Sequence, residues 1–127
     1  MTITVLVAFA VGFFGLAIWA LATPAKFVEG FGILLPKPES RSEVRAVYGG
    51  FGLAFAGVLT FAALQSSSGP GSLRAGIMLT LGVAMAGMVV GRIISAVADG
   101  GTPFYPNWAY AIAEGGAATA LLLTAQG

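Results

Sequence analysis

Four long apolar stretches constrain this chain more than any other feature, because each is long enough to cross a bilayer core, for which about 20 residues suffice. They cover residues 3–22, 43–65, 73–98 and 106–125. The connections are too short for a separate aqueous domain, and ten-residue segments of alternating polarity, typical of a transmembrane barrel, do not occur. The sequence therefore predicts an all-α integral membrane protein: one four-helix bundle over residues 1–127 with short loops.

Composition supports this prediction. The 127 residues are 57% hydrophobic and 9% charged, with a mean hydropathy of +0.92, whereas a soluble domain this small needs many more surface charges. Cysteine and histidine do not occur, which excludes disulfides, thiolate or imidazole metal ligands and histidine-based catalysis. The acidic residues are too scattered for a cation site, and six basic residues form no nucleic-acid patch. We expect no catalytic residue, metal or cofactor.

The first stretch resembles a secretory signal, because Ala20-Leu21-Ala22 looks like a cleavage site. It lacks a basic n-region and its apolar run is too long, so we expect a retained span. The next segment, residues 24–35, places apolar side chains around Lys26 and Glu29. This pattern predicts a short interfacial helix, which serves either as a lid or as a plain linker.

The distribution of basic residues predicts an orientation. Face A is defined as the membrane face with the N-terminus and loop 66–72, and face B as the one with loops 23–43 and 99–106. Arg74 is the only basic side chain of the half nearer face A. The half nearer face B contains all the others: Lys26, Lys37, Arg41, Arg45 and Arg92. The positive-inside rule then places face B in the cytoplasm and both termini on the outer side.

Several short patterns predict where helices begin and end. Ser40-Arg41-Ser42-Glu43 has the form of a capping box, with Ser40 as N-cap. Ser72 is the expected N-cap of the third long helix, and Asp99-Gly100-Gly101 is expected to end it. Pro106 suits the first turn of the fourth helix.

Polar residues form three stripes that begin at face B and descend into the membrane. Helical spacing aligns them on one face of each of the last three long helices: Arg41, Arg45 and Tyr48; Arg92, Ser95 and Asp99; Asn107, Tyr110 and Glu114. In antiparallel helices rising 1.5 Å per residue, Arg92 and Glu114 both lie about 10 Å below face B. We therefore predict an ion pair between them. The polar cluster is defined as Glu43, Arg45, Tyr48, Arg92, Ser95, Asp99, Tyr110 and Glu114.

Glycines inside the apolar stretches predict close helix packing. Gly49 and Gly50 follow Tyr48 directly, and Gly87-x-x-x-Gly91 is a small-x-x-x-small pair of the kind that lets helix backbones approach. Packing within the bundle is the favoured interpretation, and a face for a second copy of the chain is the alternative.

Three interpretations of the polar cluster remain open. It holds the helices in register, it forms a pocket at face B for a lipid headgroup or another anionic ligand, or Glu114 takes part in proton transfer or catalysis. A neighbouring arginine stabilises the charged carboxylate, which argues against the third interpretation.

The order of these residues resembles that of a known family. The combination is Glu43-x-Arg45-x-x-Tyr48-Gly49-Gly50, then Gly91-Arg92-x-x-Ser95, then Asp99-Gly100, then Glu114 in the last stretch. It resembles a family of small bacterial four-span membrane proteins of unknown function, the domain of unknown function 4345 type. The resemblance implies a four-helix bundle in the bacterial inner membrane and carries no activity, substrate or cofactor.

Two classes of function fit the sequence. The first is a non-catalytic membrane protein, an accessory subunit or small scaffold whose partners are lipids and another membrane protein or a second copy. The second is a membrane protein that binds a lipid or a small hydrophobic or anionic ligand, with or without enzymatic or transport activity. A small exporter is less favoured, because the deep glutamate lies in the last span beside an arginine. A polar cluster whose members pack against one another with no cavity favours the first class, and a cavity at face B favours the second.

Overall fold

The protein is all-helical. The computed structural model describes residues 1–126, and within that range every regular element is a helix, which confirms the predicted fold class. The elements in chain order are α1 (Thr2–Ala22), α2 (Pro24–Glu29), α3 (Pro38–Val44), η1 (Arg45–Gly50), α4 (Phe51–Ala63), α5 (Leu73–Ala98), η2 (Phe104–Trp108) and α6 (Ala109–Thr124).

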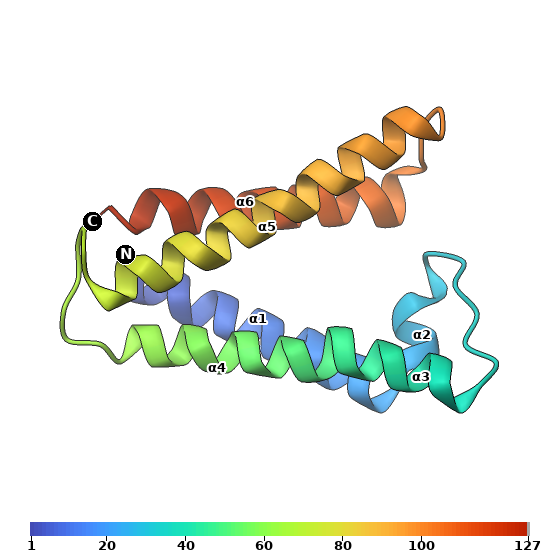
Figure 1. Ribbon diagram of the computed structural model, residues 1–127, viewed down its shortest axis with the longest axis horizontal. Helices are drawn as coiled ribbons and strands as arrows, with labels where there is room; N and C mark the ends of the chain where they lie inside the picture. Colours follow the sequence, from blue (N-terminus) through green and yellow to red (C-terminus); the bar gives the residue numbers. More distant parts are fainter. Residues whose placement is uncertain (127) are drawn as a thin grey trace.

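The long helices form two antiparallel pairs (Figure 1). The first hairpin pairs α1 with the continuous helix made of α3, η1 and α4, in which η1 is a stretch of wider, π-helical turns. The second hairpin pairs α5 with α6. Both chain ends and the α4–α5 connection lie at one end of the molecule, face A, and the two hairpins separate toward face B.

The main hydrophobic core lies where the hairpins meet, in the half nearer face A. Each of the four long helices contributes a completely buried side chain to it: Leu6, Leu59, Met78 and Leu121. Small residues such as Ala62 and Ala117 fill the space between these side chains. Dispersion contacts in this core therefore join the two hairpins at face A.

A smaller core lies at the opposite end of the first hairpin. Helix α2 turns back after Thr23 and buries Phe27 and Val28 against Ala20 of α1 and Val44 of α3. The Phe27 ring centroid lies 5.0 Å from that of Trp19 and 5.2 Å from that of Tyr48. The predicted short helix after the first span is thus present, and its apolar side packs on protein.

Most predicted helix ends agree with the structure. The Ser72 hydroxyl accepts a hydrogen bond from the Ala75 amide at 3.1 Å, as an N-cap does. After α5, Gly100 and Gly101 have positive φ angles, and the Gly101 amide donates to the Ala96 carbonyl at 2.8 Å. This 6→1 bond is that of a Schellman motif, which glycine permits because it has no Cβ.

The predicted capping box is wrong. Helix α3 begins at Pro38, its N-cap is Lys37, and no side chain caps it. Proline presets the helical φ angle and lacks the amide hydrogen that a first turn leaves unbonded, so the helix starts two residues before Ser40. Ser40 and Glu43 consequently lie inside the helix.

Three of the helices in the described residues are long and apolar enough to cross a membrane: α1, the continuous helix Pro38–Ala63, and α5. Helix α6 has 16 residues. The chain before it has non-helical backbone at Tyr105, and helical backbone resumes at Pro106. The fourth span therefore stays a prediction.

Candidate functional site

An ion pair joins the two helices of the second hairpin. Arg92 of α5 donates from Nε to Glu114 Oε2 at 2.6 Å and from Nη2 to Oε1 at 2.7 Å, so the guanidinium grips the carboxylate with two parallel hydrogen bonds. The Glu114 side chain is 7% exposed and that of Arg92 is 20% exposed. The predicted pairing is present because antiparallel helices bring these two residues to the same depth.

Aromatic rings flank the guanidinium. Its central carbon lies 5.3 Å from the ring centroid of Tyr110 and 5.8 Å from that of Phe31, distances at which a cation is attracted to a π face. Phe31 follows α2 and belongs to the connection of the first hairpin. The neighbouring Gly30 lies close to Tyr105, since an added Cβ would lie 2.8 Å from Tyr105 Cε1. The Gly30–Phe31 segment therefore links the two hairpins near face B.

The other members of the polar cluster divide between the hairpins. On the first hairpin, Arg45 donates from Nε to the Leu21 carbonyl at 2.9 Å, while Glu43 is exposed. On the second hairpin, the Ser95 hydroxyl donates to Asp99 Oδ2 at 3.2 Å on the exposed surface of α5. The structure thus brings Arg92, Tyr110 and Glu114 together, while Arg45, Ser95 and Asp99 have other partners.

Arg74 is a polar anchor that the sequence prediction missed. It is 8% exposed and donates from Nε to the Ala62 carbonyl at 2.9 Å, and from Nη2 to the carbonyls of Ala63 and Gln65. These carbonyls lie at the end of α4, where a helix leaves oxygens without intrahelical partners. The sequence does contain a pattern that predicts this contact: the loop between α4 and α5 is short, and Arg74 lies in the first turn of α5. A short loop places such a side chain beside the end of the preceding helix.

All four arginines of the chain bind protein oxygen atoms. Arg92 binds Glu114, Arg74 binds the end of α4, Arg45 binds the end of α1, and Arg41 donates from Nη1 to the Leu35 carbonyl at 3.1 Å. A positive charge at a helix C-terminus also interacts favourably with the helix dipole. These arginines hold segments of the chain together.

The glycines predicted to pack closely behave differently from one another. An added Cβ at Gly49 would lie 2.5 Å from Leu21 Cδ2, so η1 approaches α1 closely there. At Gly50 the nearest atom is 3.9 Å away, and at Gly87 and Gly91 nothing lies within 4 Å. The close approach between α5 and α6 occurs instead at Gly82, where an added Cβ would lie 2.8 Å from Leu122 Cγ.

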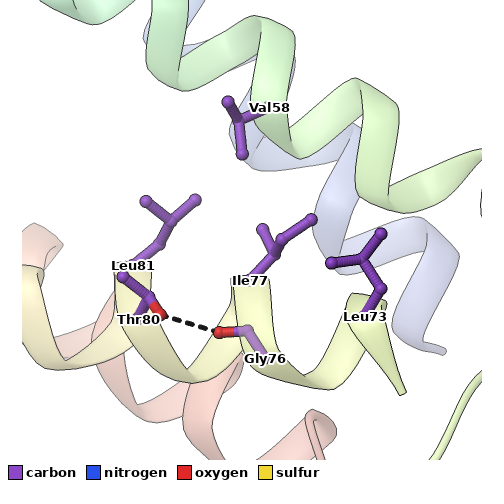
Figure 2. A pocket seen from close by; sticks show the side chains of 6 residues that line it. All are labelled: Val58, Leu73, Gly76, Ile77, Thr80 and Leu81. Atoms are coloured by element: carbon purple, nitrogen blue, oxygen red, sulfur yellow. Dashed lines mark hydrogen bonds between the residues drawn. The ribbon is translucent and has the colours of Figure 1, made fainter.

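Two apolar grooves lie in the half nearer face A, away from the ion pair. One runs between α4 and α5 (Figure 2), and the other runs between α1 and α4 beside Gly57 and Phe14. In residues 1–126, no three acidic side chains come together as a metal site would require.

These features define a class: an all-helical protein of two hairpins, with three helices of membrane-spanning length and a buried ion pair. The chain belongs to the family described as domain of unknown function (DUF4345), whose family model matches residues 1–125. Neither a curated protein nor a solved structure matches this chain.

Proposed function

We propose that this protein is a non-catalytic integral membrane protein of the bacterial inner membrane, which acts as a small scaffold or as an accessory subunit of a larger complex. The observation that carries the proposal is that Glu114 and all four arginines bind partners within the chain. Their hydrogen bonds hold segments of the fold together, and Arg92 and Glu114 bind each other.

The ion pair lacks the features of a reaction centre. Both carboxylate oxygens of Glu114 accept hydrogen bonds from Arg92, so the carboxylate is already oriented by a partner within the chain. Cysteine and histidine, the usual nucleophile and base at neutral pH, do not occur. A bidentate arginine–carboxylate pair instead fixes the register of the two helices that contribute it.

The outer surface supports a membrane location with partners in the membrane. Large apolar side chains on α1, α4 and α5 remain exposed, among them Val11, Phe51, Ile94 and Val97, each more than half exposed. Water solvates such a surface poorly, whereas lipid chains or another membrane helix cover it without cost. Four spans with face B in the cytoplasm agree with the charge distribution and with both termini lying at face A.

Native mass spectrometry of protein extracted gently from its own membrane tests the proposal. A second membrane protein, or a second copy, bound in fixed stoichiometry would support it. A protein that is always monomeric, with a polar metabolite bound, would contradict it.

Binding of an anionic ligand at face B is the second candidate function. It is favoured by Arg45, which is exposed and in the described residues donates only from Nε, so that its terminal nitrogens can reach a phosphate or carboxylate. Arg45→Gln should then remove a retained anionic ligand while the ion pair of Arg92 stays intact. Retention of the ligand by this variant would contradict binding at Arg45.

A further inference from the structure

The two hairpins are held together unequally at their two ends. At face A the joint is the main core, to which each long helix contributes a completely buried side chain, and Arg74 of α5 binds the end of α4 there as well. At face B, where the hairpins separate (Figure 1), Phe31 contacts the second hairpin and its side chain stays 37% exposed. The joint at face B is therefore the weaker one, because a contact that stays exposed removes little apolar surface from water or lipid.

Phe31 contacts the second hairpin through its ring. The ring centroid lies 5.4 Å from that of Tyr110 and 5.8 Å from the central carbon of the Arg92 guanidinium. The hydrogen bonds of Arg92 are accepted by Glu114, on the same hairpin, and not by the segment that contains Phe31. The ion pair, and with it the second hairpin, therefore does not need the ring in order to form.

The chain on both sides of Phe31 is anchored on the first hairpin. On one side Val28 is buried in the smaller core. On the other side Leu35 packs against the same core, and its carbonyl accepts a hydrogen bond from Arg41 Nη1 at 3.1 Å. The chain between these anchors is a loop in which Gly32 has a φ of 71°, a left-handed conformation that glycine adopts readily. The middle of this loop can therefore leave the second hairpin while both anchors stay in place.

We infer that residues 30–35 form a latch that opens and closes the face B ends of the two hairpins. In the closed state, which this structure shows, the Phe31 ring covers the Arg92 guanidinium and holds the hairpins together. In the open state the ring leaves, the hairpins move apart at face B about the core at face A, and the ion pair becomes accessible from the side of the first hairpin. The segment after the first span thus acts as a lid, whichever partner or ligand the protein binds.

A distance measurement between spin labels tests the latch, and the absence of cysteine from the chain makes the labelling specific. Ser42→Cys on α3 and Ala98→Cys on α5 place the labels at exposed positions near face B, one on each hairpin. The full-length protein is reconstituted in phosphatidylcholine nanodiscs, and the label distances are recorded by double electron–electron resonance. We expect Phe31→Ala to raise the ratio of long to short distances by about ten-fold, the change that about 1.4 kcal/mol of lost contact produces.

Three controls separate a latch from a general effect on the fold. Leu34→Ala truncates an 86% exposed side chain of the same segment and should leave the distances unchanged. Phe31→Trp keeps an aromatic face that attracts the guanidinium, and it should keep the short distance. A second label pair, Ile3→Cys on α1 and Leu123→Cys on α6, lies at face A and should report the same distance with and without Phe31→Ala.

Two results would overturn the inference. Identical face B distances in the wild type, Phe31→Ala and Leu34→Ala would show that the ring does not hold the hairpins together. Longer distances at both faces in Phe31→Ala would show that Phe31 supports the whole fold and is not a latch.

Discussion

At the scale of single residues, the pairing of Arg92 with Glu114 leads to a double-mutant prediction. Arg92→Ala or Glu114→Ala alone leaves a buried charge without its partner, which costs about 3–5 kcal/mol of unfolding free energy. The double replacement removes both charges and should therefore cost less than either single one. The measurement is the free energy of unfolding of all four proteins by denaturant titration in mixed micelles.

Arg92→Lys is the control for geometry, since it keeps the charge and loses the planar fork that makes two parallel hydrogen bonds. The free energy of unfolding of Arg92→Lys should lie between those of the wild type and Arg92→Ala. Additive losses in the double variant would mean that the two residues are not coupled.

Arg74 leads to a second prediction at this scale. Arg74→Met keeps much of the side-chain length but leaves the carbonyls at the end of α4 without their donor. Each buried group left unsatisfied costs about 1–3 kcal/mol, so the midpoint of thermal unfolding should fall clearly. Lys26→Met, at an exposed position, is the matched control and should leave it nearly unchanged. Equal midpoints for the two variants would show that Arg74 contributes no anchor.

At the scale of elements, the packing of α5 on α6 depends on one glycine. An added Cβ at Gly82 would lie 2.8 Å from Leu122 Cγ, whereas at Gly87, on the same helix, it would meet nothing within 4 Å. Gly82→Val should therefore lower the free energy of unfolding by about 1–3 kcal/mol through overpacking. Gly87→Val should change it by less than about 0.5 kcal/mol. The reverse order of stability would contradict the observed packing of the second hairpin.

The sequence pattern alone could not distinguish these two glycines. Gly87 and Gly91 have the spacing of a packing motif, but spacing does not reveal which side of a helix faces its neighbour. That side depends on how α5 rotates to bury Met78 and Met85 in the core, and this rotation turns Gly82 toward α6. The start of α3 was mispredicted for a more local reason, because the effect of Pro38 outweighed the capping-box pattern.

At the scale of the whole molecule, the main prediction concerns orientation. Reporter fusions at either terminus should be active only with a reporter that works outside the cytoplasm, because the positive-inside rule places face B in the cytoplasm. Replacing Lys26, Lys37 and Arg41 with neutral residues should weaken this preference and give mixed reporter activity. Reporters that place both termini in the cytoplasm would refute the predicted topology.

The two-hairpin arrangement also explains why the polar cluster is divided. The hairpins share a core at face A and meet again near face B through Phe31, which contacts Arg92 and Tyr110 of the second hairpin. The apolar groove of Figure 2 lies beside the core at face A, since Ile77 and Leu81 line the groove and also pack against that core. The relative position of the hairpins is thus fixed at both ends of the molecule.

The sequence by itself determined the all-helical class, the long apolar helices and the pairing of Arg92 with Glu114, because these follow from helical rise, hydropathy and the cost of burying a lone charge. Only the tertiary structure decided which glycines touch a neighbour, that Arg74 caps α4, and that an apolar groove separates α4 from α5. The physical reason is that these features depend on the rotation and tilt of whole helices. Helix rotation and tilt are set by contacts between residues far apart in the chain, which local periodicity does not record.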